Sequence, residues 1–101
     1  MQPTSLEAYA EVKRSLNSKQ RIVLNVLDNL TYNGGSQTNT EIAQHIGVPI
    51  NTITTRVLEL REKGLVTEHV KRFCRITGHK AIAWRVRRPE EIAERQMEMA
   101  L

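Results

Sequence analysis

Apolar residues recur at helical intervals over the first third of the chain. Thr4 and Glu7 have the spacing of a capping box, and the apolar positions that follow predict a first helix over residues 5–16. Asn17 or Ser18 then offers a side-chain oxygen that can cap a second helix. The stripe expected to bury this second helix consists of Ile22, Val23, Val26, Leu27 and Leu30.

Two further helices are expected after a glycine-rich segment at 32–36. That segment follows a helix and lacks a Gly-Lys-Ser/Thr sequence, so it is interpreted as a plain loop. Thr38 and Glu41 have capping-box spacing, Gly47 tolerates a positive φ at a tight turn, and Pro49 pre-sets φ at the start of the next helix. The residues expected to face inward are Ile42, Ala43 and Ile46, and then Ile50, Ile53, Val57 and Leu60.

The periodicity changes from helical to alternating after residue 64. Gly64 ends the fourth helix, and residues 65–76 and 81–86 flank a turn at 77–80, which predicts a β-hairpin. The side chains expected on its inward face are Cys74, Ile76, Ile82, Trp84 and Val86, with Arg85 and Arg87 pointing away.

The fourth helix carries an unusual polar face opposite its apolar stripe. Asn51, Thr52 and Thr55 lie there, flanked by Thr54 and Arg56. Threonine and asparagine are poor helix formers, so a purely structural helix gains stability from Lys, Glu or Gln at such positions. Short polar side chains let a helix approach base edges in a DNA groove, and Asn or Arg can make bidentate contacts there. A solvated helix face remains the alternative.

Composition and charge set the outer bounds. A chain of 101 residues can bury one modest core, so we expect a single domain over 1–101. It has no apolar run long enough to span a bilayer and no signal-like amino terminus, which predicts a cytoplasmic protein with no membrane partner. The net charge is +4, and residues 65–88 hold seven lysines and arginines against one glutamate. This basic segment favours a polyanionic partner.

The segment at 89–101 is acidic and should form a short terminal helix. Pro89 followed by Glu90 and Glu91 suits a helix start. Its apolar face is loose, which leaves three alternatives: pairing with a second copy of the chain, folding back onto Leu6 and Tyr9, or fraying.

Other chemistry has little support. His45, His69 and His79 are far apart in sequence and have no second cysteine, so we expect no metal site and no cofactor. Cys74 lies between arginines, which leaves a redox thiol open, although an inward-facing strand cysteine is usually packing. No nucleophile pattern is present, so we expect no catalysis.

Over residues 18–88 the chain resembles winged helix-turn-helix domains of the bacterial multiple-antibiotic-resistance regulator (MarR) class and, more weakly in the wing, small phage or prophage winged-helix proteins. The resemblance rests on Thr40-Glu41-Ile42-Ala43, Gly47-Val48, Asn51 to Val57, Leu60, Lys63-Gly64-Leu65-Val66 and Gly78. It implies an α+β, mainly helical fold with a β-hairpin wing and short terminal helices. It also implies that the helix at about 49–63 enters the major groove while the wing, at about 70–80, contacts backbone phosphates or the minor groove.

The resemblance assigns two sets of DNA-contacting residues. The base-proximal residues are Asn51, Thr52, Thr54, Thr55 and Arg56. The backbone and wing residues are Thr38, Asn39, Lys71, Arg72, Arg75, His79 and Lys80. The expected function is sequence-preferring binding of double-stranded DNA by a homodimer that regulates transcription. Two alternatives remain: a DNA-binding component of a phage replication or development complex, and a protein-docking adaptor.

Overall fold

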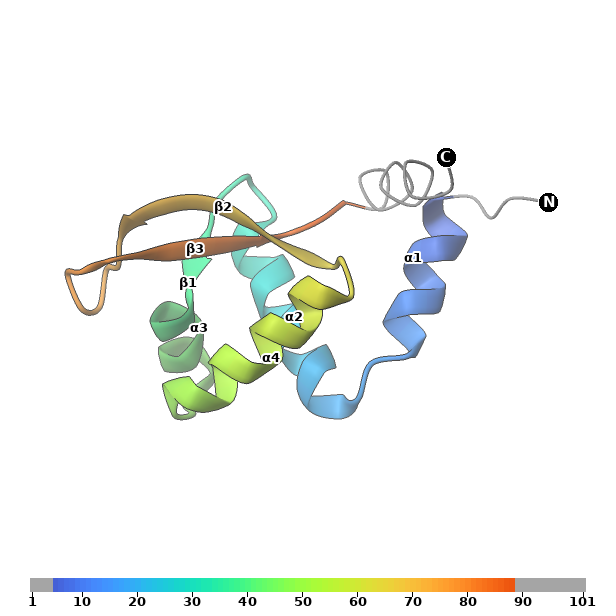
Figure 1. Cartoon of the computed structure of the whole chain (residues 1–101), viewed down its shortest axis with the longest axis horizontal. Coiled ribbons are helices and arrows are strands. Elements are labelled where there is room, and N and C mark those ends of the chain that lie inside the picture. The colour runs from blue at the N-terminus through green and yellow to red at the C-terminus, as the bar shows by residue number, and fades with distance from the viewer. Residues whose placement is uncertain (1–4, 89–101) are drawn as a thin grey trace.

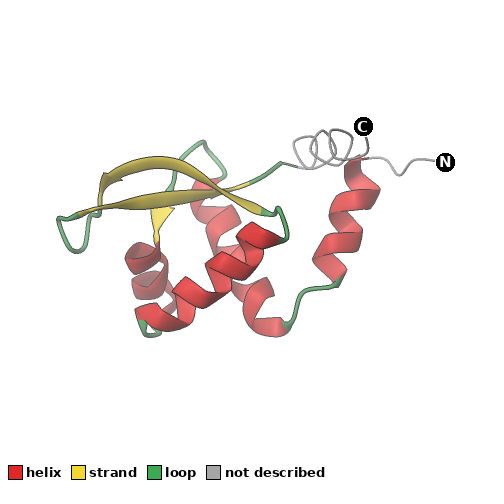
Figure 2. Ribbon diagram, viewed as in Figure 1, coloured by secondary structure: helices red, strands yellow, loops and turns green. Residues whose placement is uncertain are grey.

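The structure is a computed structural model that describes residues 5–88, with side chains from residue 10 onward. Helices and strands are mixed along these residues (Figures 1 and 2), as expected for an α+β fold. The elements are α1 (Ser5–Arg14), α2 (Ser18–Thr31), β1 (Gln37–Thr38), α3 (Asn39–Ile46), α4 (Ile50–Glu62), β2 (Val66–Phe73) and β3 (Lys80–Val86).

Helix α2 begins at a complete capping box. The Asn17 side chain accepts from the Gln20 backbone N–H at 2.8 Å, and the Gln20 side chain accepts from the Asn17 N–H at 3.1 Å. The buried stripe is centred on Val23, Leu24 and Leu27. The expectation that Ile22 is part of this stripe was wrong, since Ile22 is 53% exposed and Leu24 occupies the inner position.

Helices α3 and α4 flank a tight turn, as the sequence predicts. Gly47 ends α3 with φ of 86°, in the left-handed region that favours glycine. Pro49 is the residue before α4 and has an extended ψ of 146°, so it caps the helix instead of forming its first position. Ile53, Val57 and Leu60 are buried. Ile50 was wrongly placed in the core, because it lies in the first turn of α4, beyond the end of the core, and is 47% exposed.

A three-stranded antiparallel sheet has the order β1-β3-β2. Strand β1 is only two residues long and has no alternating pattern, so the sequence did not predict it. Trp84 is buried, but Ile76 and Ile82 are 48% and 37% exposed, which corrects their assignment to the inward face. The hairpin of β2 and β3 extends past α3 (Figure 1), so no helix lies beneath its tip, where the turn contains Ile76. Ile82 is not in the turn but pairs with Lys71 in the sheet.

The core lies where α2, α3 and α4 meet one side of the sheet. Its fully buried side chains include Leu24, Leu27, Ile42, Ile53, Leu60 and Leu65. Leu16, two residues after the end of α1, also joins this cluster. Among the described residues, no helix is long and apolar enough to cross a membrane. The expected terminal helix at 89–101, and with it the proposed dimer contact, lies outside the described residues.

Candidate nucleic-acid interface

The polar face of α4 is open to solvent. Asn51, Thr52, Thr54 and Thr55 are all exposed. The Thr54 hydroxyl donates to the Ile50 carbonyl at 3.1 Å, and the Thr55 hydroxyl donates to the Asn51 carbonyl at 3.2 Å. These bonds to the preceding turn satisfy the hydroxyl protons within the helix. The methyl groups and oxygen lone pairs remain able to contact a ligand laid along this face.

Arg56 differs from its exposed neighbours. Its Nε lies 3.2 Å from the Glu59 carboxylate, and its side chain is 22% exposed. Glu59 also accepts from the Gln20 side chain of α2 at 3.1 Å. Glu59 therefore links the Arg56 guanidinium to Gln20 of α2. Because of this contact, Arg56 is less free than Asn51 to turn toward a ligand.

The wing presents exposed cationic residues around a well-defined turn. Lys71, Arg75, His79 and Lys80 are exposed. The turn is closed by bonds from the Cys74 N–H to the His79 carbonyl at 2.8 Å and from the Gly78 N–H to the Cys74 carbonyl at 2.9 Å. Gly78 has φ of 73°, which a residue with a Cβ rarely adopts.

Arg72 does not share this exposure and points to the interior of the domain. Its Nη1 and Nη2 donate to the two carboxylate oxygens of Glu41 in α3, at 2.9 and 2.7 Å. Nη2 also donates to the Ser36 carbonyl at 2.7 Å. Since β3 separates β2 from β1, this side chain crosses β3 at the small residue Ala81, its direct cross-strand partner. The sequence-based phosphate contact of Arg72 is therefore replaced by a structural role.

Glu41 is the centre of this cluster. Besides Arg72, its carboxylate accepts from the backbone N–H groups of Thr38 at 3.1 Å and Arg75 at 2.8 Å. The hydrogen bonds from Arg72 are the largest cause that lowers the pKa of Glu41, to about 2, while burial opposes the shift. We call Glu41, Arg72 and the Ser36 backbone the wing latch, because they join the hairpin to the first turn of α3.

The two residues expected to donate to phosphate at the start of α3 lie less favourably for that contact. Thr38 is 1% exposed, and its hydroxyl accepts from the Glu41 N–H at 3.2 Å. It serves as the helix cap and is too deeply buried to reach a phosphate. Asn39 is half-buried, and its Oδ1 has no hydrogen-bond partner among the residues that the structure describes.

Cys74 lies just past the end of β2 and is buried. Its Sγ is 3.1 Å from the Thr38 hydroxyl. Burial raises the pKa of the thiol, but hydrogen bonds from Thr38, Thr77 and Ile76 outweigh that effect and the net shift is downward. The side chain packs the wing against the cap of α3, in agreement with the packing interpretation.

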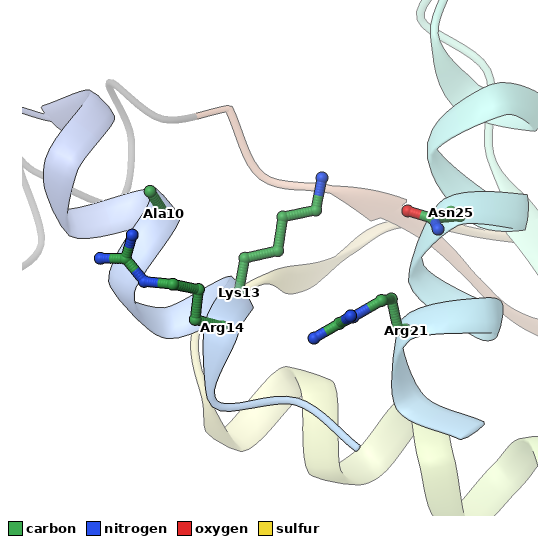
Figure 3. A pocket seen from close by; sticks show the side chains of 5 residues that line it. All are labelled: Ala10, Lys13, Arg14, Arg21 and Asn25. Carbon is green, nitrogen blue, oxygen red and sulfur yellow. The ribbon is translucent and has the colours of Figure 1, made fainter. Parts of the chain in front are cut away.

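A cleft of about 390 Å³ lies between α1 and α2 (Figure 3). The lining residues are Ala10, Lys13, Arg14, Arg21 and Asn25. Arg21 points from α2 toward α1. The cleft is at the end of the molecule opposite the wing tip (Figure 1), so it is separate from the surface formed by α4 and the wing.

The first turns of α4, helix α3 and the wing tip lie toward the same end of the molecule (Figure 1). A helix–turn–helix whose second helix exposes short polar side chains thus stands beside a cationic β-hairpin. Such a pairing of a groove-sized helix with a basic hairpin is typical of DNA-binding domains.

Comparisons with known proteins agree with this geometry. Residues 19–67 match a family model described as winged helix-turn-helix DNA-binding. The fold is that of a winged helix-turn-helix domain, and the hairpin of β2 and β3 is its wing. No curated protein matches the sequence significantly.

Among solved structures, the chain is similar to a possible transcriptional regulator from Methanosarcina mazei Go1. The TM-score is 0.59 at 10% sequence identity, over 94% of this chain and 81% of that chain. Because the sequence identity is only 10%, this similarity shows a shared fold alone.

Sequence reasoning missed the wing latch. The capping-box spacing identified Glu41 as a helix-start residue, and the basic run identified Arg72 as a cation. Their pairing across 31 positions leaves no local signal in the chain, because it depends on how the hairpin folds over the start of α3.

Proposed function

We propose that this protein binds double-stranded DNA with sequence preference and regulates transcription. The main support is the exposed Asn and Thr face of α4 at the same end of the molecule as the exposed cations of the wing. The match to a DNA-binding family supports DNA as the partner. The transcriptional role has weaker support, from the fold shared with the possible transcriptional regulator of Methanosarcina mazei.

In this proposal, α4 lies in the major groove and reads base edges. Asn51 suits a bidentate contact with adenine, and the methyl groups of the threonines suit the thymine methyl. Thr52, Thr54 and Thr55 are short enough to let the backbone of α4 come close to the bases. Arg56 is expected to contact DNA only at the edge of this surface, because Glu59 holds its Nε.

The wing supplies backbone contacts in the same proposal. The proposed phosphate-contacting residues are Lys71, Arg75, His79 and Lys80, with Asn39 at the start of α3 as a polar addition. The latch holds the outer part of the hairpin in a fixed orientation relative to α3. Contacts from α4 and from the wing can then form together without a further entropic cost of ordering the hairpin.

Selection of bound duplexes from a random pool tests this function. We expect a defined motif to emerge from wild-type protein. On that motif, Asn51→Ala should relax preference at one or two base pairs, at about 1–3 kcal/mol of lost discrimination. Arg75→Ala should weaken binding to all sequences and lower the log–log salt slope by about one.

Asn29→Ala is the matched control, since Asn29 is an exposed asparagine on α2. It should leave both the motif and the affinity unchanged. If no duplex is retarded in a low-salt gel shift, the DNA-binding proposal fails and the protein-docking adaptor becomes the better interpretation. Binding without any selected motif would contradict the base-reading assignment alone.

A further inference from the structure

The pairing of β2 and β3 sorts the side chains of the wing into two faces. Arg72 pairs with Ala81, and the Arg72 side chain leads into the latch. Directly paired residues share a face, and neighbours along a strand alternate. The opposite face therefore carries the pairs Lys71–Ile82 and Phe73–Lys80. Apolar and cationic side chains alternate on it.

The tip of the wing is unusually apolar for an exposed hairpin. Phe73, the last residue of β2, is 64% exposed, and Ile76 in the turn is 48% exposed. The Lys80 Nζ lies 5.7 Å from the centre of the Phe73 ring. About half or more of each of these apolar side chains stays exposed within the described fold, so they are available to a partner.

The charges around the tip restrict the chemistry of that partner. Residues 69–88 contain seven lysines and arginines and no acidic residue. Arg72 is neutralised by Glu41, whereas Lys71, Arg75 and Lys80 are exposed. A partner that covers the tip must therefore offer apolar surface together with negative charge.

The minor groove of DNA has this arrangement, with sugars and base edges between two rows of phosphates. It is narrow, about 6 Å in B-DNA, and suits a thin element such as a hairpin tip. Exposed Phe and Ile side chains are among those that enter it as wedges and partly unstack a base step.

Resting on the proposed function, we infer that Phe73 and Ile76 form an apolar wedge that enters the minor groove and unstacks a base step beside the site read by α4. Lys71, Arg75 and Lys80 contact the phosphates on either side of the wedge. The wing thereby adds sequence preference through the deformability of that step, in addition to charge neutralisation.

The test uses the full chain and a duplex that contains its selected motif, with 2-aminopurine placed in turn at steps flanking the α4 footprint. Unstacking raises the fluorescence of this base analogue. We expect wild-type protein to raise it several-fold at one or two adjacent steps. Ile76→Ser and Phe73→Ser should abolish the rise and weaken binding by about ten-fold, while Ile76→Leu retains both.

Ile22→Ser is the matched control, because Ile22 is 53% exposed on α2 while Ile76 is 48% exposed on the wing. It should behave as wild type in both measurements. Circular dichroism checks that each serine variant is folded, as expected for substitutions of exposed side chains.

The outcomes separate the two proposals. The wedge proposal fails, while DNA binding stands, if wild-type protein binds the duplex but the fluorescence of 2-aminopurine rises at no position. It fails in the same way if the wing variants match wild type in both measurements. If wild-type protein binds no duplex in the same gel shift, the proposed function itself fails. In that case the apolar tip belongs to a protein-docking surface.

Discussion

Glu41 and Arg72 are the residues through which the wing is fixed to the helices. Both side chains are largely withdrawn from solvent, with 5% and 22% exposure, and their contact is bidentate. Two backbone N–H groups fill the remaining acceptor positions of the carboxylate. These hydrogen bonds favour the ionised form of the carboxylate, so they stabilise the fold only while Glu41 is ionised.

Acid should therefore weaken the fold through Glu41. Its folded-state pKa of about 2 lies below the ordinary value of 4.5, so its stabilising contribution is complete above about pH 5 and is lost as the pH falls toward 2. The shift corresponds to roughly 3 kcal/mol. Urea unfolding of wild type and Glu41→Gln checks this. The difference in their free energies of unfolding should be smaller at pH 2.5 than at pH 7. An NMR titration midpoint of Glu41 near 4.5 would contradict the latch as the cause.

At the scale of elements, the turn between α3 and α4 decides where the polar face of α4 points. Gly47 closes α3 with its N–H bonded to the Ala43 carbonyl at 2.8 Å, and Val48 donates to the same carbonyl at 3.1 Å. A Cβ at Gly47 would meet nothing within 4 Å, so the requirement for glycine is conformational and not steric.

Gly47→Ala should destabilise the protein by about 1 kcal/mol, because its φ of 86° strains an alanine backbone. Gly47→Asn should cost less, since asparagine tolerates this region better. Gly35→Ala is the control: Gly35 does not have a positive φ, and a Cβ there would make an ordinary contact with the Leu30 carbonyl at 3.5 Å. Thermal unfolding of the three variants checks the order. Equal losses at both glycines would refute the conformational argument.

At the scale of the whole molecule, the latch couples the sheet to the helix–turn–helix. Arg72 starts on the edge strand β2, passes over β3 and ends at the start of α3. The hairpin tip beyond this point has no helix beneath it (Figure 1). Together with the bond from the Arg75 N–H to Glu41 and the contact of Cys74 with Thr38, the latch joins the outer part of the wing to α3.

Removing this link should loosen the wing without unfolding the core. In Arg72→Gln, we expect faster amide hydrogen exchange at Phe73 to Lys80 and unchanged protection in α2. DNA affinity should fall while the salt slope stays near that of wild type, in contrast with Arg75→Ala. A decrease of about one in the log–log salt slope of Arg72→Gln would instead indicate that Arg72 contacts a phosphate.

Much of this architecture follows from short-range signals. The cap of α2 at Asn17, the capping box of α3, the left-handed turn at Gly47 and the hairpin around Gly78 depend on residues close together in the chain, so the sequence predicts them directly. The Gln20 half of the α2 capping box was not predicted. The exposure of Asn51, Thr52 and Thr55 follows from the helical period once Ile53, Val57 and Leu60 are buried. The single-domain organisation, the dimer and the DNA-contacting role of each residue stay predictions.

The sequence alone determined where the helices and the hairpin form and which side of α4 is polar, because these depend on local spacing and on periodicity. Only the tertiary structure decided that Arg72 faces inward, that Thr38 is buried, and that Phe73 and Ile76 stay exposed at the wing tip. The physical reason is that burial of a side chain depends on which distant element covers it. Glu41, which is 31 positions from Arg72 in the sequence, forms hydrogen bonds with it in the fold, whereas no helix lies beneath the end of the hairpin.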